Sequence, residues 1–375
     1  MKKSLLLLPS ILCLSLSGCV SDPKEVTFIL NDVGQVDYHT DVQKQFWAED
    51  DFESSLLKYG NGENDLDKPN PIHITFDVKT ASKYTLNISE NEDLSNPLSY
   101  TSKKKYFDVY NLKIGTKYYY SVTAKYSSKS FTSEVSSFET LKEGPRNLYV
   151  EGVNNIRDIG GFNTSSGKVV KQGLIYRSAK MNESDVSKVK NTITKNGINV
   201  MINEFGIKTD IDLRKTELKD DGTNEIGGLK ESPLGKGVNY VNCPMYYEGS
   251  AVIAHTSKAK DTFNKESIKK MFDVLGDRNN YPLVFHCTQG KDRTGALAYL
   301  METVLGMEQD DIYHDYLFTN LSKIGGYCAY KAFSGYDYYL NKMEGQNLQE
   351  KAYNYLLSIG VSKTTIDNFI DIMLG

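Results

Sequence analysis

The sequence has 375 residues, a formal net charge of −4 and 39% hydrophobic residues. This acidic balance excludes a general nucleic-acid binder, which would carry a strongly basic surface. The chain is also longer than one hydrophobic core usually organises, so we expect two domains.

Residues 1–18 predict an export signal. Two lysines precede an apolar run at residues 5–16, which is the layout of a secretory signal peptide and is too short for a permanent membrane-spanning helix. The run ends in Leu16-Ser17-Gly18-Cys19, which resembles the lipobox of bacterial lipoproteins. This resemblance implies cleavage before Cys19, lipidation of its thiol and anchoring to the outer face of a bacterial cell membrane. An ordinary secretory peptide with an incidental cysteine is the alternative.

The remaining cysteines argue against a disulfide or metal scaffold. Removing residues 1–18 takes away two lysines and no acidic residue, which leaves 42 basic against 48 acidic residues. Besides Cys19, the mature chain keeps Cys243, Cys287 and Cys328, which are too few and too scattered for a disulfide framework or a zinc site. We expect no metal and no cofactor, and at least one free thiol that needs an explanation.

Residues 25–142 predict an all-β sandwich. Apolar side chains alternate with polar ones in three segments, and the apolar sets are Ile72, Ile74, Phe76 and Val78; Tyr84, Leu86 and Ile88; and Tyr118, Tyr120, Val122 and Ala124. The stretch at residues 112–122 resembles the penultimate strand of fibronectin type III-like sandwiches, with residues 135–141 as the closing strand. Such a domain is a spacer from the membrane or a carbohydrate- or protein-binding module. Residues 41–70 are longer and more acidic than it needs.

Residues 146–375 predict an α/β domain with a central, mainly parallel sheet flanked by helices. After Glu143-Gly144-Pro145, strand-like runs alternate with helical ones. Short apolar runs at 207–213, 238–243 and 283–285 predict strands. Residues 264–275 predict a helix with Asn264 as its N-cap, and residues 294–305 predict one that ends at Gly306.

The segment between the last strand and the last of these helices carries the chemistry. It reads His286-Cys287-Thr288-Gln289-Gly290-Lys291-Asp292-Arg293-Thr294-Gly295. Five residues between Cys287 and Arg293 let the backbone curve so that its N–H groups point at a phosphate, and the following helix adds its positive end. Such a loop also stabilises a thiolate, so Cys287 is the expected nucleophile. Arg293 offers a planar fork for two phosphate oxygens, and Thr294 can donate its hydroxyl to the sulfur. The expected phosphate-binding residues are Thr288, Gln289, Gly290, Lys291, Asp292 and Arg293.

This segment resembles the signature of the protein tyrosine phosphatase superfamily, in the branch whose Gly-Lys-Asp-Arg-Thr-Gly loop occurs in bacterial tyrosine and lipid phosphatases. Three further motifs of that branch occur in the right order, at residues 155–162, 173–178 and 206–214. The resemblance spans residues 148–375. It implies hydrolysis of phosphate monoesters through a phosphate covalently bound to Cys287, with phosphorylated proteins or phosphoinositides as substrates.

The general acid has two candidates, Asp292 in the loop and Asp212 at the end of a neighbouring strand. Better-known tyrosine phosphatases carry this aspartate in a Trp-Pro-Asp loop, but Trp47 is the only tryptophan here and lies in the expected β domain. The resemblance favours Asp292. Its alternative role is a helix cap or a salt bridge to Arg157.

Several smaller questions stay open at this stage. Lys291 is either a second cation for multiply phosphorylated head groups or a solvated loop lysine. Cys243 and Cys328 are either resolving thiols for oxidised Cys287 or buried hydrophobic residues. Residues 327–339 form a lid or part of the core. A rhodanese-like sulfurtransferase fits the loop less well, and a surface adhesin with a vestigial phosphatase domain is the alternative function.

Overall fold

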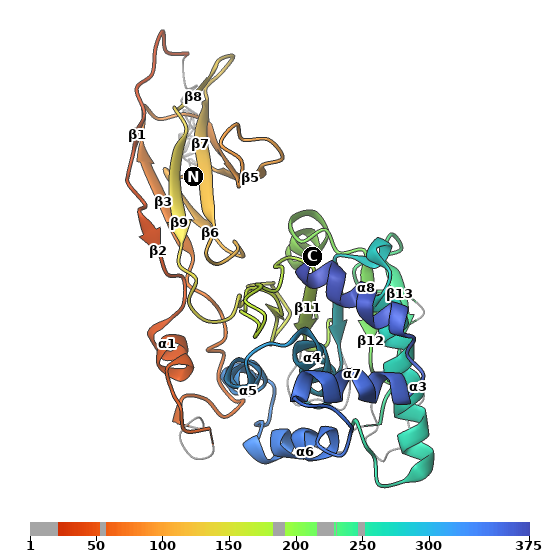
Figure 1. Ribbon diagram of the computed structural model, residues 1–375. Coiled ribbons are helices and arrows are strands. Elements are labelled where there is room, and N and C mark those ends of the chain that lie inside the picture. Colours follow the sequence, from red (N-terminus) through yellow and green to blue (C-terminus); the bar gives the residue numbers. More distant parts are fainter. Residues whose placement is uncertain (1–21, 53–57, 183–191, 216–228, 230, 247–251) are drawn as a thin grey trace, which may run out of the picture. The chain divides into compact units, whose positions relative to one another are not determined.

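The computed structural model describes residues 22–375 except 53–57, 183–191, 216–228, 230 and 247–251 (Figure 1). The expected signal peptide and Cys19 lie outside the described residues. Two compact units emerge from the contacts within the chain. The first comprises Met1–Val33, His73–Phe107 and Tyr118–Ser137, and the second comprises Gly34–Ile72, Asp108–Lys117 and Phe138–Gly375. This division differs from a boundary near residue 142, because residues 34–72 belong with the α/β unit.

The N-terminal β region contains two sheets. One has three strands in the order β1-β3-β6, and the other has the order β2-β9-β7-β4-β5, with β8 paired to β7. Every apolar residue of the three alternating sets is buried, which confirms the predicted strand faces. The strands are β1 (Ile29–Leu30), β2 (Gln35–Val36), β3 (Ile72–Asp77), β4 (Lys83–Ser89), β5 (Leu98–Ser102), β6 (Tyr106–Val109), β7 (Lys117–Lys125), β8 (Ser130–Thr132) and β9 (Ser136–Thr140).

The α/β unit is built on a five-stranded sheet in the order β10-β11-β14-β12-β13. Only the β10–β11 pair in this sheet is antiparallel, so the predicted, mainly parallel sheet is confirmed. The strands are β10 (Arg157–Asp158), β11 (Ile175–Ser178), β12 (Thr209–Asp212), β13 (Asn239–Asn242) and β14 (Leu283–His286). The helices are α1 (Asp41–Trp47), α2 (Lys195–Asn199), α3 (Lys258–Leu275), α4 (Asp292–Leu305), α5 (Gln309–Phe318), α6 (Tyr330–Leu340), α7 (Leu348–Ser358) and α8 (Lys363–Leu374), with a π-helical turn at Val200–Glu204 and 3-10 turns at Arg278–Asn280 and Thr319–Leu321.

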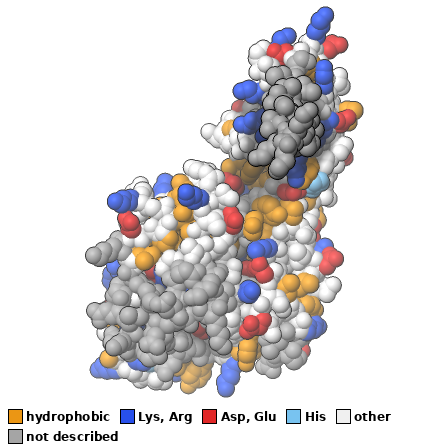
Figure 2. Space-filling view, turned by 180° about the vertical axis from the view of Figure 1, so that it is seen from behind, with side chains coloured by type: hydrophobic (Ala, Val, Ile, Leu, Met, Phe, Trp, Pro, Cys, Tyr) orange, Lys and Arg blue, Asp and Glu red, His pale blue; other side chains and the backbone are white. Residues whose placement is uncertain are grey.

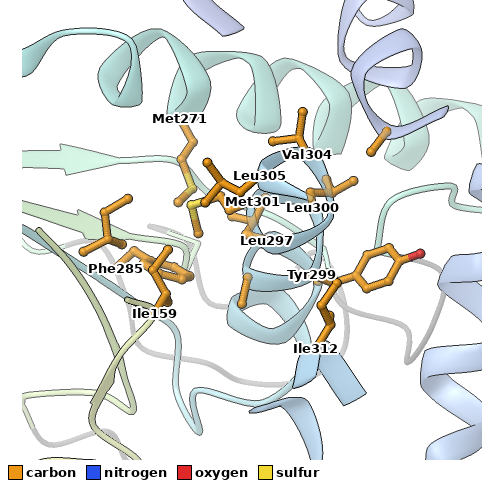
Figure 3. Close-up of a cluster of buried hydrophobic side chains, with 14 of the residues drawn as sticks. Ile159, Met271, Phe285, Leu297, Tyr299, Leu300, Met301, Val304, Leu305 and Ile312 are labelled. Carbon is orange, nitrogen blue, oxygen red and sulfur yellow. The ribbon is translucent and has the colours of Figure 1, made fainter. Parts of the chain in front are cut away.

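Helix α4 lies at the centre of the hydrophobic core. Its apolar side chains pack with Phe285 of β14, Met271 of α3 and Ile312 of α5 (Figure 3). A helix that is apolar on nearly all sides belongs inside a protein. Fully burying one such side chain contributes about 1.5–3 kcal/mol. The helix ends at Gly306, whose φ of 76° is left-handed, as the sequence predicted. This core therefore holds α4, and with it the loop that precedes α4, in a rigid position.

Residues 34–72 pack against the α/β unit through helix α1. A capping box between Thr40 and Gln43 starts the helix. Phe46 is fully buried and meets Phe318 edge to face at 5.7 Å. Trp47 stacks on His314 with ring centroids 4.8 Å apart. Trp47 therefore contributes to the core around α5, although it lies within residues 25–142, the predicted bounds of the β domain.

The prediction of Asn264 as a helix N-cap is wrong. Helix α3 begins at Lys258 with Ser257 as its N-cap residue. Asn264 lies inside the helix, where its side-chain amide donates to the carbonyl oxygens of Tyr246 and Val252, each at 3.0 Å. Its side-chain oxygen accepts from the Tyr246 N–H at 2.8 Å. The asparagine is buried because it supplies hydrogen bonds to a neighbouring loop, a non-local role with no local signal.

On the face drawn in Figure 2, the described residues show no single dominant charge. Basic and acidic side chains are interspersed on the face in Figure 2. Within the described part of the chain, no helix is both long enough and apolar enough to cross a membrane.

Candidate active site

Cys287 follows the buried strand β14 and begins the loop that leads into α4. Leu283, Val284 and Phe285 are fully buried, and Cys287 is 2% exposed. The parallel register aligns Ser178 at the end of β11 and Asp212 at the end of β12 with His286. Because parallel strands present their carboxyl ends at one edge of the sheet, three of the motifs noted in the sequence meet beside Cys287.

Gly290 is required in this loop for two reasons. Its φ is 68°, which disfavours residues with a side chain. A Cβ at this position would lie 2.6 Å from the Ser178 carbonyl oxygen and 2.8 Å from the Asn155 side-chain nitrogen. The loop backbone thus lies directly on β11 and on Asn155.

Two side chains fix the loop from behind. Asn155 donates from its amide to the carbonyl oxygens of Gln289 and Gly290, at 3.0 and 3.1 Å. Arg177 donates to the Gly290 carbonyl oxygen at 3.1 Å. With these carbonyl groups held on the far side, the backbone N–H groups of the loop are left to face a ligand, which is how an anion-binding loop is pre-organised.

A buried ionic cluster supports these two side chains. Arg157 donates to both the carboxylate and the backbone carbonyl of Asp315, each at 2.6 Å, and also bonds the side chain of Asn155. Arg177 pairs with the other oxygen of Asp315. Burial raises the pKa of Asp315, but Arg157 and Arg177 outweigh it and hold the pKa below its usual range. Burial and the neighbouring Asp315 raise the pKa of Glu302 well above its usual range.

The opening motif at residues 155–162 also has a purely structural member. Asp158 pairs with Arg146 at 2.7 Å and accepts the Gly160 N–H at 2.8 Å. The residues of this motif therefore have different roles. Asn155 bonds the catalytic loop directly, Arg157 bonds the side chain of Asn155, and Asp158 shapes the turn that follows.

His286 lies behind Cys287 and is fully buried. Its Nε2 is 3.1 Å from a carboxylate oxygen of Asp210, and its Nδ1 is 3.3 Å from the Cys287 carbonyl oxygen. Burial lowers the pKa of His286, but the carboxylates of Asp212 and Asp210 more than offset this and raise it. His286 thus contacts the backbone of Cys287, the residue that it was expected to support.

Arg293 lies in the first turn of α4 and is 3% exposed. Its guanidinium donates to the Met245 carbonyl oxygen at 3.5 Å. Thr294 is buried, but its hydroxyl has no hydrogen-bond partner among the described residues, and the same holds for the Thr288 hydroxyl. The expected bond from Thr294 to the sulfur of Cys287 is therefore not present in this structure.

The two candidate acids differ in their environment. The side chain of Asp292 is 20% exposed and has an ion pair with Lys291 at 3.7 Å. Burial raises its pKa, and the cations Lys291 and Arg293 only partly oppose this. Asp212 is fully buried and accepts two hydrogen bonds from the Arg214 side chain, at 2.9 and 2.7 Å. Burial raises the pKa of Asp212, but His286 and Arg214 outweigh it and hold the pKa below its usual range.

This difference favours Asp292 as the proton donor, since a general acid must still carry its proton at the working pH. The salt bridge from Asp292 to Arg157 that we had considered is not formed, because Arg157 binds Asp315. The Lys291 side chain is only 19% exposed, so it is not a fully solvated loop lysine.

The other two cysteines are poor candidates for redox partners in this conformation. Cys243 and Cys328 are buried and form no disulfide. Burial raises the pKa of each thiol to about 12, whereas exchange chemistry needs a thiolate. Both behave as buried hydrophobic residues. Among the described side chains of residues 327–339, only Cys328, Phe333 and Tyr336 are buried in the core, whereas Tyr327 and Tyr338 are exposed.

Sequence reasoning missed the residues that support the loop from a distance. Asp315 and Glu302 lie on α5 and α4, and Asp67 lies in the segment before β3. None has a local motif that marks it. No cluster of residues suited to holding a metal ion occurs within the described ranges.

Comparison with known proteins identifies the family of this chain. The model of the family described as "Tyrosine phosphatase family" matches residues 148–373. A protein of Cupriavidus necator named "Putative tyrosine-protein phosphatase H16_A0669" is 26% identical over 194 residues, which cover 48% of this chain and 64% of that protein. A protein of Meyerozyma guilliermondii named "Putative tyrosine-protein phosphatase OCA1" is 32% identical over 56 residues, which cover 15% of this chain and 30% of that protein. The chain thus spans less than two thirds of either relative.

Two solved structures also resemble the chain. They are the core catalytic domain of the PP-IP phosphatase SIW14 from S. cerevisiae in complex with citrate, and a second structure of the Siw14 catalytic core. Both are 15% identical and cover 56% of this chain and 98% of their own, with TM-scores of 0.32 and 0.31. These scores are too low to add to the family match.

Proposed function

Because the chain belongs to the tyrosine phosphatase family over residues 148–373, we propose that it is a cysteine-dependent phosphomonoester hydrolase with Cys287 as the nucleophile. One observation carries this proposal. Cys287 begins a loop that ends at Arg293, and the carbonyl groups of that loop are held from behind by Asn155 and Arg177. This arrangement suits an oxyanion on the open side of the loop.

In the first step, the Cys287 thiolate attacks phosphorus and forms an S–P bond. The P–O bond to the leaving group breaks, and its electron pair stays on the leaving oxygen. Arg293 is available to bind two of the phosphoryl oxygens as their charge rearranges. The backbone N–H groups at the start of α4 favour the same negative charge.

Asp292 gives its proton to the leaving oxygen. Its raised pKa keeps the carboxyl group protonated to higher pH than an exposed aspartate. In the second step the resulting carboxylate takes a proton from water, and that water attacks phosphorus. The S–P bond breaks, inorganic phosphate leaves and Cys287 is a thiolate again, so every proton and electron pair is accounted for.

We propose phosphotyrosine proteins or phosphoinositides as substrates. The family match favours the first class. Lys291 is adjacent to Asp292 and two positions before Arg293 in sequence. Its ammonium group adds a second positive charge, which favours substrates with more than one phosphate. A panel of phosphotyrosine peptides, phosphoserine peptides and phosphoinositides separates these classes, and the comparison of wild type with Lys291→Met reports on the second phosphate.

The decisive experiment is turnover of p-nitrophenyl phosphate by the chain lacking residues 1–19. We expect turnover by wild type and none by Cys287→Ser, with Cys243→Ser as the matched control that keeps full activity. No turnover by wild type, or equal turnover by Cys287→Ser, would leave the alternative of a surface binding protein with a vestigial phosphatase domain.

We also propose that the chain is exported and anchored through lipidated Cys19. The basic, then apolar residues 1–18 and the lipobox-like sequence support this. Several acyl chains would hold the protein stably on a membrane. Expressed in a bacterium that processes lipoproteins, wild type should incorporate labelled palmitate and sediment with membranes. Cys19→Ala should do neither, and membrane retention of that variant would contradict the proposal.

For the β region, we propose a fibronectin type III-like sandwich that serves as a spacer. Its two mainly antiparallel sheets and their buried faces support a sandwich. A spacer has no ligand, so the chain should show no retention on cell-wall or host glycans. Specific retention would favour a binding module instead.

A further inference from the structure

A short stretch outside the family match lies along the back of the catalytic loop. We call residues 59–67 the strap. The Gly62 N–H donates to the Asn320 carbonyl oxygen at 2.8 Å, the Leu66 N–H to the Leu321 carbonyl oxygen at 2.7 Å, and the Ile324 N–H to the Gly62 carbonyl oxygen at 2.9 Å. The strap is therefore paired, backbone to backbone, with residues 320–324 that follow α5.

The close approach of the two backbones is built into the strap sequence. A Cβ on Gly60 would lie 2.4 Å from the Asn320 carbonyl oxygen. Gly62 has a φ of 82°, and a Cβ there would lie 1.8 Å from the Gly326 carbonyl oxygen. From the other side, the Gln43 side chain of α1 donates to the carbonyl oxygens of Leu66 and Lys68, each at 2.8 Å. The end of the strap is thus held on both sides.

Asp67, at this end of the strap, points its carboxylate toward the catalytic unit. One of its oxygens accepts the hydroxyl of Ser322 and, at 3.0 Å, the backbone N–H of Asn155. Its backbone carbonyl accepts the Asn147 amide at 2.6 Å. The residue is 5% exposed. Asp67 therefore fixes the backbone of Asn155, the residue whose side chain holds the loop carbonyls of Gln289 and Gly290.

A second connection runs from the same region to the loop. The Gln289 side chain donates to the Ile324 carbonyl oxygen at 2.8 Å. The Ser322 hydroxyl is also 3.3 Å from the Asn155 side-chain oxygen. Strap, residues 320–324 and catalytic loop thus form one continuous hydrogen-bonded network.

Stability alone gives a poor reason for a carboxylate at this position. None of the ion pairs among the described residues includes Asp67, and a buried charge without a cation costs free energy. What the carboxylate adds is an acceptor for two donors of the loop support, and the geometry of a catalytic loop matters greatly for rate.

We infer that Asp67 is a positioning residue for the catalytic loop, acting through Asn155 and Ser322, so that a residue outside the family match sets the geometry of the phosphate site. This inference rests on the proposed phosphatase function. It assigns Asp67 no contact with substrate.

The test compares Asp67→Ala, Asp67→Asn and Asp65→Asn in the full-length chain, with p-nitrophenyl phosphate as substrate and inorganic phosphate as competitive inhibitor. Asp67→Ala removes the acceptor, and we expect kcat/KM to fall about ten-fold or more and the inhibition constant for phosphate to rise. Asp67→Asn keeps an oxygen that can accept both bonds, so it should restore most of the activity. Asp65 is on the same strap and pairs with Lys68, so Asp65→Asn should match wild type.

A double-mutant cycle checks the path through Asn155. If Asp67 acts through Asn155, the variant with both Asp67→Ala and Asn155→Ala should lose no more activity than Asn155→Ala alone. Losses that multiply would overturn the inference. Melting temperatures, together with assays well below them, separate an effect on loop geometry from an effect on protein stability. Replacing a residue that only stabilises the fold would lower the melting temperature and leave kcat/KM and the inhibition by phosphate unchanged.

Further results distinguish a failure of this inference from a failure of the proposed function. If Asp67→Ala does not fold, Ser322→Ala removes one partner of the same carboxylate and should lower kcat/KM several-fold; unchanged activity would count against Asp67. Absence of turnover by wild type defeats the proposed function. Active wild type with equally active Asp67→Ala defeats this inference alone.

Discussion

One aspartate lies on each side of the catalytic loop, and comparing the two shows that burial alone does not determine the pKa of a carboxyl group. On the β12 side, Asp212 receives two hydrogen bonds from the Arg214 side chain, one from the Arg214 N–H and one from the Tyr240 hydroxyl at 3.0 Å. On the α4 side, Asp292 forms an ion pair with Lys291 at 3.7 Å. Both carboxyl groups are largely buried, yet the pKa of Asp212 is lowered and that of Asp292 is raised.

The cause is the set of neighbouring cations. For Asp212, His286 and a guanidinium bonded through two nitrogens together overcome desolvation, whereas for Asp292 the cations Lys291 and Arg293 do not. The carboxyl group on the Asp292 side therefore keeps its proton to higher pH than the one on the Asp212 side. The following predictions test that contrast.

The largest expected effect is that of Asp292→Asn. Loss of a general acid should lower kcat by about 10²–10⁴-fold for a poor leaving group such as phenyl phosphate. An activated substrate such as 2,4-dinitrophenyl phosphate needs little protonation and should lose far less. Steady-state kinetics over a series of aryl phosphates measure this. Equal losses across the series would remove Asp292 from the acid role.

The pH dependence follows from the same group. Because the pKa of Asp292 is raised, its acid form persists above the usual range and is lost as pH rises through the raised value. In wild type, kcat for phenyl phosphate should therefore fall on the basic side. That basic limb should be absent in Asp292→Asn and present in Asp212→Asn.

Asp212→Asn should act on stability rather than on the leaving group. It breaks a buried pair and leaves the Arg214 charge without its carboxylate, which costs about 3–5 kcal/mol in free energy of unfolding. Urea denaturation measures that loss. In the fraction that remains folded, the relative loss of kcat should be the same for good and poor leaving groups. A loss that grows as the leaving group becomes poorer would instead make Asp212 the acid.

The buried cluster behind the loop extends the contrast to another pair of acids. Arg157 and Arg177 lower the pKa of Asp315, whereas burial and Asp315 raise that of Glu302, so we expect Asp315 to be ionised and Glu302 to carry a proton. Glu302→Gln keeps a neutral hydrogen-bonding group and should change the free energy of unfolding by less than about 1 kcal/mol. Asp315→Asn should cost about 3 kcal/mol because it leaves two buried cations with no counterion. Similar losses for both would contradict the assigned protonation states.

The last prediction concerns Asp67, where the pH dependence of stability has the opposite sign to that usual for an aspartate. Burial raises its pKa from 3.8 to about 6. The folded state then binds the proton more tightly than the unfolded state, so the stabilisation is complete below pH 3.8 and is lost as pH rises through about 6. Asp67→Asn does not titrate. Its stability relative to wild type should rise by up to about 3 kcal/mol between pH 4 and pH 7. A constant difference would show that Asp67 has an ordinary pKa.

Local patterns determined much of this protein. Alternating apolar residues predicted the faces of β3, β4 and β7, and an apolar strand before Cys287 with an apolar helix after Arg293 predicted β14 and α4. These features depend on periodicity and on neighbours in the chain, which the sequence displays directly. The assignment of Asn155–Phe162 and of Gly173–Ser178 to the catalytic unit also followed from motifs.

Tertiary structure alone decided which distant groups support the loop. No pattern in the sequence shows that Asp315 lies between Arg157 and Arg177, that residues 34–72 pack with the α/β unit, or that Asp67 reaches Asn155. The same holds for the choice between Asp292 and Asp212, since both are aspartates within two residues of an arginine in sequence. Only the fold sets the distance and direction of each cation, and these determine which carboxyl group keeps its proton.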